Sequence, residues 1–383
     1  MTALTTRVAV IGAGLIGASA ALALRRQGVP VALLDADAPG AKASGVNFGG
    51  VRRQGRPTEQ LHLAMRAHEI WPRLAQLIGI DGEYVRSGHL KLARSLEDLA
   101  SLDAYRARTA QFDLGLEIIE GAEFRRRFPQ FGPGIVGGSL CPEDGQANPR
   151  LVAPAFAQAA RRAGAHLLSP CRVLGLETQG ERIVLECSGG QRVVADQVIN
   201  AAGAWGAELA ARLGDTVPLR IKYPTMAVTE PLPPLVGVSI GVEGGGFYAR
   251  QVQRGNVVMG GGFGTAMPGG GCRPGREAIS LLGRNAPAVL PALKRAAIIR
   301  FWSGVEGYFD DKNPLIDFSA HAPAVLHAFG FSGAGFQISV AVGEVLADLL
   351  QGRPALRMAE GKFSLARFGV PAHATATKEA IAS

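Results

Sequence analysis

The chain has 383 residues, 47% of them hydrophobic, and a formal net charge of +8, so it is long enough to bury a large core and to divide into two domains. Its basic residues are scattered without aromatic interleaving, which argues against a nucleic-acid partner. We attribute the charge excess to a solvated surface, with a basic cleft that attracts an anionic substrate as the alternative.

Residues 8–35 predict a dinucleotide-binding unit. They contain, in order, an apolar strand, glycines at the spacing GxGxxG, an Ala-rich helix and a second strand that ends on Asp35. The glycines allow a tight turn and close approach of a pyrophosphate, and the start of the helix favours an anion. Asp35 is placed to bind ribose hydroxyls, which favours FAD or NAD over NADP. The glycines are Gly12, Gly14 and Gly17.

The rest of the chain alternates between helix and strand patterns. A Gly-rich loop covers 41–56, and helices are expected at 58–78, 96–112, 149–162, 276–290 and after the loop FSGAGFQ as far as 350. Strand patterns include HLKLA, IVGGSL, CRVLGLE, RIVLEC, ADQVINAAG, MAVTE, FYARQVQ, NVVMGG and 325–329.

The strand VINAAGAW and the last helix lie far along the chain from the opening unit, yet both fit the same open sheet with a cofactor. We therefore predict a discontinuous cofactor-binding domain interleaved with a substrate-binding domain. The first comprises 1–85, 145–217 and 300–365, the second comprises 86–144 and 218–299, and 366–383 form a C-terminal tail.

Neither a metal site nor a membrane span is expected. The cysteines are far apart and the histidines share no spacing, which predicts reduced thiols rather than metal ligands. The chain enters a strand within about seven residues, which leaves no room for a signal peptide. An uncharged stretch at 319–343 is interrupted by glycines, a proline and a glutamine, so we expect no transmembrane span and a cytoplasmic location. The cysteines are Cys141, Cys171, Cys187 and Cys272.

Four sequence blocks carry a resemblance to a known family. They are VAVIGAGLIG with Asp35, ASGVNFGGVRRQGR, VINAAGAW, and the pair WSGVEGYFDDKNPLID and GFSGAGFQISVAVGEVLADLL. Together they resemble the D-amino-acid oxidase family of FAD-dependent oxidoreductases, in particular its glycine oxidase, sarcosine oxidase and opine or hydroxyproline dehydrogenase branch. The resemblance implies an α/β fold in which a Rossmann-like FAD-binding domain is interleaved with a sheet-rich α+β substrate domain.

The resemblance also implies FAD in an extended conformation. The glycine turn would bind the pyrophosphate, Asp35 the ribose, and Val173 the adenine through its backbone. The loop 330–336 would place amides at the flavin carbonyl edge, where the start of the last helix stabilises negative charge. The expected cofactor-binding residues are Gly12, Ala13, Gly14, Leu15, Ile16, Gly17, Asp35, Ala36, Ser44, Asn47, Gly49, Gly50, Val51, Val173, Ala202, Gly203, Trp205, Gly304, Gly333, Ala334, Gly335, Phe336 and Gln337.

Three departures from sarcosine oxidases matter. Gly304 replaces the cysteine that tethers the flavin, so we expect noncovalent FAD. Val258 stands where those enzymes have a lysine that promotes reaction with oxygen, which favours a quinone or a partner protein as electron acceptor. Ala334 and Gln337 replace a histidine and a carboxylate-binding lysine, so the substrate carboxylate must be anchored elsewhere.

The candidate substrate residues are Arg52, Arg53, Tyr248, Arg250, Glu306 and Gln337. An arginine fork suits a carboxylate, although these arginines could instead bind FAD phosphate or surface acids. Glu306 replaces an arginine of glycine oxidases, so it would attract an ammonium or guanidinium group and favour substrates with a cationic group beyond the α-amine. The alternative is a Glu306 that forms a salt bridge with a nearby arginine.

The expected activity is oxidation of the C–N bond of an amino acid or secondary amine, such as a D-amino acid, a hydroxyproline or an opine. A hydride would pass to flavin N5 and the imine product would hydrolyse. One alternative is a peroxide-forming oxidase of the same substrates. Another is a flavoprotein subunit that only relays electrons or supports assembly.

Overall fold

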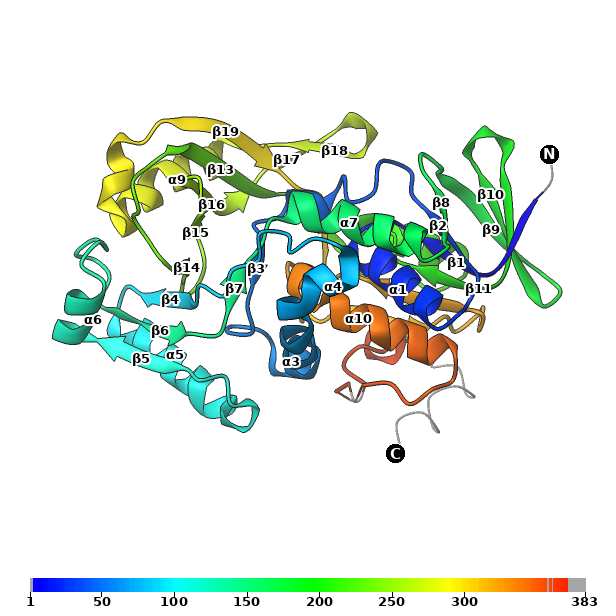
Figure 1. Cartoon of the computed structure of the whole chain (residues 1–383), viewed down its shortest axis with the longest axis horizontal. Helices are drawn as coiled ribbons and strands as arrows, with labels where there is room; N and C mark the ends of the chain where they lie inside the picture. Colours follow the sequence, from blue (N-terminus) through cyan, green and yellow to red (C-terminus); the bar gives the residue numbers. More distant parts are fainter. Residues whose placement is uncertain (1–2, 357, 360, 371–383) are drawn as a thin grey trace.

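The computed structural model describes residues 3–356, 358–359 and 361–370 and contains two large sheets side by side (Figure 1). The first sheet has the strand order β21-β22-β11-β1-β2-β8, with β10 paired to β11 and β9 to β10. Its central strands run parallel and are almost wholly buried, as expected for a sheet covered on both faces. The strands are β1 (Leu4–Ile11), β2 (Val31–Leu34), β8 (His166–Leu168), β9 (Val173–Gln179), β10 (Arg182–Cys187), β11 (Arg192–Asn200), β21 (Leu315–Phe318) and β22 (Val325–Phe329).

Three helices pack together on one side of this sheet (Figure 1). They are α1 (Leu15–Arg26), α7 (Pro149–Arg162) and α10 (Gly335–Leu350). A Cβ built on Gly343 would lie 2.5 Å from the Cβ of Ser19, so α10 approaches α1 closely. The chain also forms α2 (Ala43–Val46), α3 (Leu61–Ile70), α4 (Leu74–Ile78) and α8 (Gly206–Arg212).

The helix expected at 58–78 is wrong as a single element. The segment forms a short 3-10 turn at Thr58–Gln60, then α3, a second 3-10 turn at Trp71–Arg73 and α4. Pro72 lies in that second turn and has no backbone N–H to donate, so the helix breaks there. In the same turn, the Trp71 indole N–H donates to the carbonyl of Gln337 at 2.8 Å.

The second sheet has the strand order β19-β13-β16-β15-β14-β4-β6-β5. One of its faces packs on α9 (Arg276–Val289) around an apolar core. The strands are β4 (His89–Ala93), β5 (Glu117–Glu120), β6 (Gly137–Cys141), β13 (Pro224–Pro231), β14 (Ser239–Val242), β15 (Tyr248–Gln251), β16 (Asn256–Phe263) and β19 (Ile298–Ser303); α5 (Leu96–Arg108) and α6 (Gly121–Arg127) flank β5 and β6.

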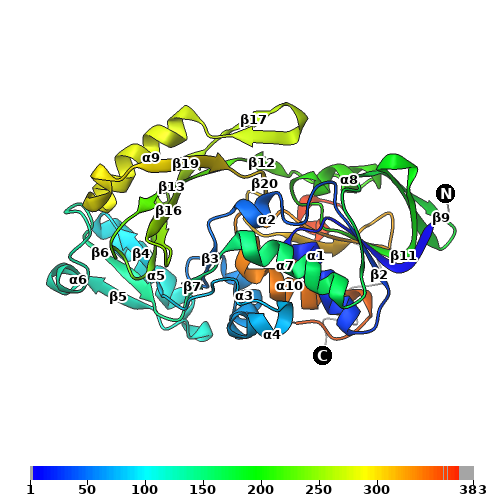
Figure 2. The same ribbon diagram turned by 45° about the horizontal axis from the view of Figure 1, so that its top comes forward.

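Short strand pairs complete the structure. In both ribbon views β3 and β7 lie between the two large sheets, and Figure 2 shows β12 and β20 near the same region. The pairs are β3 (Gly50–Val51) with β7 (Gly145–Gln146), β12 (Arg220–Lys222) with β20 (Glu306–Tyr308), and β17 (Thr265–Met267) with β18 (Gly271–Arg273). The pairs β3–β7 and β12–β20 therefore lie in the region where the two large sheets approach each other.

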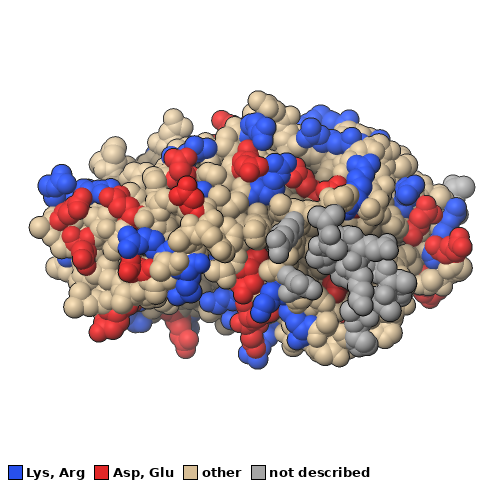
Figure 3. All heavy atoms as spheres, turned by 90° about the horizontal axis from the view of Figure 1, so that it is seen from below, with Lys and Arg blue, Asp and Glu red and all other residues tan. Residues whose placement is uncertain are grey.

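Charges of both signs are interspersed over the face shown in Figure 3. Many of the surface arginines have carboxylate partners, such as Arg127 with Glu117 and Arg66 with Glu344. This pattern supports the solvated-surface interpretation of the charge excess for that face.

A buried hydrogen-bond network joins β11 to β22. The amide Nδ2 of Asn200 and Nδ1 of His327 lie 3.2 Å apart, and Nε2 of His327 lies 3.0 Å from Oδ2 of Asp215. Nδ1 of His321 lies 3.0 Å from Oδ1 of the same carboxylate. Asp215 and His327 are fully buried. Although burial opposes ionisation of Asp215, hydrogen bonds from His327, Ser319 and His321 lower its pKa to about 2.

Replacing Asp215 by Asn is expected to remove an acid-dependent part of the stability. The carboxylate has a lower pKa in the folded chain than its usual 3.8, so its contribution is full above about pH 4 and is lost as the pH falls toward 2. A shift of this size corresponds to about 2 kcal/mol. Urea unfolding at pH 7 and at pH 3 should show that wild type loses more stability on acidification than Asp215→Asn. Equal losses would contradict this assignment.

Candidate active site

The turn between β1 and α1 brings the first group of expected cofactor residues together. A Cβ built on Gly12 would lie 2.4 Å from the carbonyl oxygen of Ala201, and one built on Gly17 would lie 1.9 Å from the carbonyl oxygen of Gly12. Both positions therefore exclude a side chain. In the described chain, α1 has no side-chain cap at Gly14 and no acidic residue in its first turn. Its positive end is thus left for an anion.

The side chains of Asp35 and Ser44 accept hydrogen bonds from backbone amides of this turn. Oδ2 of Asp35 accepts a hydrogen bond from the Ala13 amide at 2.6 Å, and Oγ of Ser44 accepts one from the Leu15 amide at 2.9 Å. The protein itself therefore uses two amides that we expected to contact the cofactor. Burial raises the pKa of Asp35, and its backbone hydrogen bonds oppose that rise. Its carboxylate stands at the end of β2, where its remaining acceptor capacity fits ribose hydroxyls.

The loop around α2 is held by its own side chains. Nδ2 of Asn47 donates to the carbonyl of Ser44 at 2.7 Å, and its Oδ1 accepts from the Gly49 amide at 2.8 Å. Gly49 has a φ of +86°, and a Cβ there would lie 2.2 Å from the carbonyl oxygen of Ala147. Nε1 of Trp302 donates to the carbonyl of Val46 at 2.8 Å. Asn47 thus positions the loop, and Gly49 lets it pass close to β7.

The other expected cofactor residues lie on the loop after β11, at the start of β9 and before α10. Ala202 follows Ala201, whose amide donates to the carbonyl of Ile11 at 2.9 Å. The Trp205 ring has Lys42 Nζ 5.9 Å from its centroid, and Val173 opens β9. The described residues of these segments thus surround the carboxyl ends of the central parallel strands, where open α/β sheets bind their ligands.

One face of the second sheet carries the candidate substrate residues. Arg250 of β15 pairs with Val258 of β16, and Tyr248 lies two residues before Arg250, so the three side chains point to the same side. The Tyr248 ring packs edge-on against Phe48, with centroids 4.8 Å apart. Nε of Arg250 donates to the carbonyl of Phe48 at 2.6 Å. This face is therefore turned toward the loop that follows α2.

Arg250 is buried without a carboxylate partner. It is only 6% exposed, and burial lowers its pKa to about 10, so it stays charged at neutral pH. Among the described residues, none of the Asp or Glu oxygens lies within 4.0 Å of its guanidinium, although Glu83 is near enough to raise its pKa slightly. A buried charge is costly unless it is paired. Arg250 therefore suits a ligand that brings its own carboxylate.

Glu306 and Tyr308 form a second polar group on β20. The Tyr308 hydroxyl lies 2.8 Å from Oε2 of Glu306 and donates to it. A Cβ built on Gly333 would lie 3.2 Å from that hydroxyl and 3.8 Å from Oε2, so the pair abuts the loop before α10. Burial raises the pKa of Glu306 and also that of Tyr248, to whose rise the Glu306 charge adds. In the part of the chain that is described, Glu306 forms no salt bridge with an arginine.

Two candidate side chains already have polar partners within the protein. Arg53 is buried, and its Nε lies 3.1 Å from Oδ1 of the buried Asp144, so its charge is already balanced. The Gln337 side chain is buried in the helix layer, where its amide donates to the carbonyl of Ala64 at 2.9 Å. We therefore propose neither as a substrate anchor. Arg52 stays a candidate because it is partly exposed and has no carboxylate within 4.0 Å among the described residues.

Sequence reasoning missed Tyr308. In a strand, residues two apart point to the same face, and the pattern EGY would have placed a hydroxyl beside Glu306 once that short strand was recognised. The glycines around it concealed the strand, because they are typical of loops.

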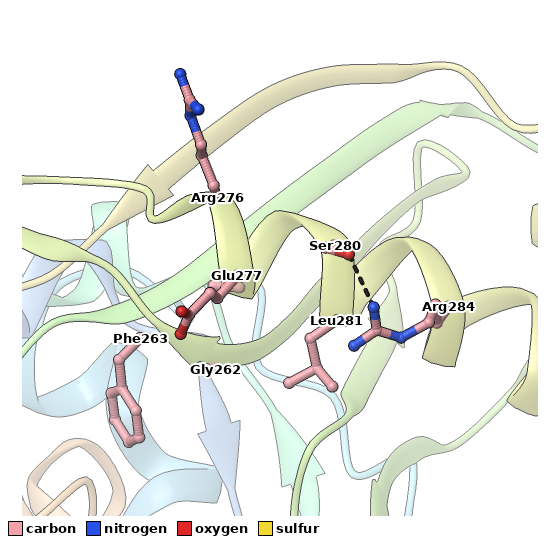
Figure 4. A pocket seen from close by; sticks show the side chains of 8 residues that line it. Gly262, Phe263, Arg276, Glu277, Ser280, Leu281 and Arg284 are labelled. Atoms are coloured by element: carbon pink, nitrogen blue, oxygen red, sulfur yellow. Dashed lines mark hydrogen bonds between the residues drawn. The ribbon is translucent and has the colours of Figure 1, made fainter.

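A surface hollow of about 650 Å³ lies elsewhere, between the end of β16 and α9 (Figure 4). Phe263 and Leu281 contribute to its lining, and Oγ of Ser280 accepts a hydrogen bond from Arg284 at 2.9 Å. The hollow shares no lining residue with the glycine turn, Arg250 or Glu306. It is therefore separate from the candidate active site.

Comparison with known proteins identifies the family. A sequence model described as "DAO: FAD dependent oxidoreductase" matches residues 7–349. The chain belongs to this family. The expected family, the α/β fold and FAD as cofactor are thereby confirmed, and the protein is an FAD-dependent oxidoreductase.

Relatives of this oxidoreductase span nearly its whole length. An opine oxidase subunit from Rhizobium meliloti is 28% identical, covering 82% of this chain and 85% of the relative. Glycine oxidase of Geobacillus kaustophilus is 27% identical, covering 96% and 97%. In structure, L-proline dehydrogenase from P. horikoshii matches with a TM-score of 0.88 and 24% identity, covering 96% of this chain and 99% of that one. The structural likeness shows the shared fold.

None of the helices described here combines the length and apolar character needed to cross a bilayer. Within the described residues, no group of three or more His, Cys, Asp or Glu side chains could hold a metal ion.

Asp35→Ala is expected to weaken retention of FAD in this oxidoreductase by roughly tenfold or more, because hydrogen bonds to a charged acceptor contribute about 1.5–3 kcal/mol. Equilibrium dialysis of free FAD against apoprotein measures the change. Asp37→Ala removes a neighbouring exposed carboxylate paired with Lys42 and serves as the control. Equal affinities in Asp35→Ala and wild type would mean that Asp35 is not the ribose ligand.

Proposed function

We propose that this protein oxidises the C–N bond of an amino acid or secondary amine, of the D-amino acid, hydroxyproline or opine type, to an imine that then hydrolyses. The observation that carries the proposal is the buried guanidinium of Arg250, which faces the loop after α2 and has no carboxylate within 4.0 Å in the described part of the chain. Opine oxidase and glycine oxidase among the relatives act on substrates of this class by name. FAD, when bound, supplies the acceptor of the hydride.

The protein's own residues orient the substrate. Arg250 holds the carboxylate by two parallel N–H donors, and the Tyr248 ring packed on Phe48 supports that position. Glu306 receives the amine: Tyr308 occupies its Oε2, which leaves Oε1 to bind the ammonium group and accept its proton. The amine becomes neutral in this way, as loss of a hydride from its α-carbon requires. We thus assign the attraction of Glu306 to the reacting amine rather than to a further cationic group.

The same proposal includes noncovalent FAD and an electron acceptor other than oxygen. Gly304, whose amide donates to the carbonyl of Pro224 at 3.1 Å, offers no sulfur for a tether. Val258 shares a face with Arg250, and its side chain brings no cation to stabilise negative charge as oxygen is reduced. A quinone or a partner protein would then reoxidise the enzyme.

Val258→Lys is expected to accelerate reoxidation by oxygen by roughly tenfold or more, since a nearby cation stabilises the charge that develops on oxygen. Stopped-flow mixing of the reduced enzyme with oxygenated buffer measures the rate. Val258→Met, which adds length without charge, is the control. If both variants reoxidise at the wild-type rate, Val258 does not face the reacting centre.

The opine oxidase subunit among the relatives favours a second candidate function, in which the chain relays electrons or supports assembly within a complex. Assaying the isolated chain with D- and L-amino acids, sarcosine, prolines and opines distinguishes the two. Our proposal expects reduction of an artificial quinone with at least one of them, faster than oxygen uptake. Oxygen uptake as fast as quinone reduction would indicate a peroxide-forming oxidase, and no turnover by either route would favour the role of a relay or assembly subunit.

A further inference from the structure

A second group of cations lies on the same face of the sheet as Tyr248 and Arg250. Gly241 of β14 pairs with Tyr248 on one side and with Lys91 of β4 on the other. Residues paired across neighbouring strands point to the same side, and two strand spacings separate the backbones of Tyr248 and Lys91 by about 10 Å. The Lys91 side chain therefore faces the same space as the candidate substrate residues.

The loop after β3 brings Arg52 and Arg56 to Lys91. A Cβ built on Gly55 would lie 3.2 Å from Nη1 of Arg52 and 3.4 Å from Nζ of Lys91, so both charged groups converge on this glycine. Nε of Arg56 donates to the carbonyl of Arg52 at 2.9 Å. Burial, with the nearby Arg52 charge, lowers the pKa of Arg56 to about 9. We call Arg52, Arg56 and Lys91 the basic cluster.

The protein supplies the basic cluster with too few carboxylates. Lys91 forms a salt bridge with Glu243, which also accepts a hydrogen bond from Ser101 at 2.8 Å. Asp144 contributes attraction at longer range, but its oxygens are taken by Arg53 and by two backbone amides. Among the described residues, Arg52 and Arg56 have no carboxylate within 4.0 Å. Three cations thus share one directly bonded carboxylate.

His89 does not reduce this imbalance. Its Nδ1 lies 2.8 Å from Oε1 of Gln54, and burial together with the three cations holds its pKa well below the usual range. It is therefore neutral at physiological pH. Like charges gathered in a poorly solvated place destabilise one another, and an anion bound from outside would relieve that cost.

We propose that the basic cluster binds a second acidic group of the substrate, so that the enzyme acts on amines that carry two carboxylates. The inference rests on the proposed function, in which Arg250 holds the first carboxylate. Arg250 lies two residues along β15 from Tyr248, so its backbone and that of Lys91 are separated by two strand spacings and two residues, roughly 12 Å. A substrate that reaches both carries its second carboxylate several bonds from the first, on an N-substituent or at the end of a side chain.

The test uses the FAD-loaded enzyme and inert acids that have no C–N bond to oxidise. Glutarate and adipate are titrated against the monocarboxylates pentanoate and hexanoate, and binding is followed by the change in flavin absorption. The dicarboxylates should bind at least tenfold more tightly than the monocarboxylates of equal length. Equal affinities would overturn the proposal. Because no turnover is needed, this result does not depend on whether the enzyme oxidises amines.

Variants that are expected to change the preference for dicarboxylates in opposite directions test where the second carboxylate binds. Arg52→Gln and Lys91→Gln should abolish the preference for dicarboxylates over monocarboxylates, whereas Glu243→Gln should increase that preference because it removes a repelling charge. Arg127→Gln, on α6, is the control. If Arg250→Gln is the one variant that loses monocarboxylate binding, that result supports Arg250 as the first carboxylate anchor, independently of the basic cluster. If Glu243→Gln lowers the preference for dicarboxylates, or if Lys91→Gln leaves it unchanged, the second carboxylate does not bind at the basic cluster.

Discussion

Arg250→Gln is expected to lower kcat/KM for the preferred amino acid by roughly two to three decades. Arg250 is buried and lacks a carboxylate partner among the described residues, so its guanidinium and the substrate carboxylate would form a desolvated charge pair. Removing one member of such a pair costs roughly 2–5 kcal/mol. Steady-state quinone reduction measures the effect, and the matched amine without a carboxylate should be turned over at a nearly unchanged rate.

Two further variants serve as controls for Arg250→Gln. Arg254→Gln changes an exposed arginine on the turn after β15 and should behave as wild type. Arg250→Lys retains a charge but loses the fork of donors, so it should recover only part of the activity. The FAD content of each variant is measured as well, since Nε of Arg250 also fixes the carbonyl of Phe48. Equal losses for the amino acid and for the amine without a carboxylate would make Arg250 a residue that only positions the loop.

Glu306→Gln is expected to lower kcat/KM by roughly two to four decades, the usual contribution of a positioned acid or base. It should also change the pH profile. The wild-type carboxylate must be ionised to accept the ammonium proton, and burial raises its pKa, so activity should fall as the pH drops through that raised value. In Glu306→Gln this acidic decline should be absent.

Tyr308→Phe is the companion variant for Glu306. It removes the hydroxyl that stabilises the ionised carboxylate, so the acidic decline should move to higher pH while the maximum rate stays closer to wild type. Unchanged profiles in both variants would contradict the role of Glu306 as a base.

The sequence predicted the β1–turn–α1–β2 unit at the start of the chain, because local physical rules determine it. The glycine turn requires positions without side chains, as the contacts at Gly12 and Gly17 show, and the acidic residue follows from the end of β2. These features lie within one short segment, so spacing alone reveals them. The single helix expected at 58–78 was wrong because one proline interrupts it.

The substrate part could be predicted only in outline. The sequence offers no ground for choosing among Arg52, Arg53 and Arg250 as the carboxylate anchor. The fold shows that Asp144 neutralises Arg53, whereas Arg250 has no carboxylate partner among the described residues. Gln337 was expected to contact the substrate and the cofactor, yet its side chain packs toward α3, where its amide donates to the carbonyl of Ala64. Such differences depend on contacts between residues that are more than 80 positions apart along the chain, which no local pattern encodes.

Anaerobic reduction of the bound flavin tests the central proposal most directly. The purified holoenzyme is mixed without oxygen with D- and L-amino acids, sarcosine, prolines and opines, and the visible absorption of the oxidised flavin is followed. We predict rapid bleaching by at least one of these compounds, and none by the corresponding hydroxy acids or by Arg250→Gln at the same concentration. A flavin that dithionite reduces but that no amino acid or amine bleaches would contradict the proposed function.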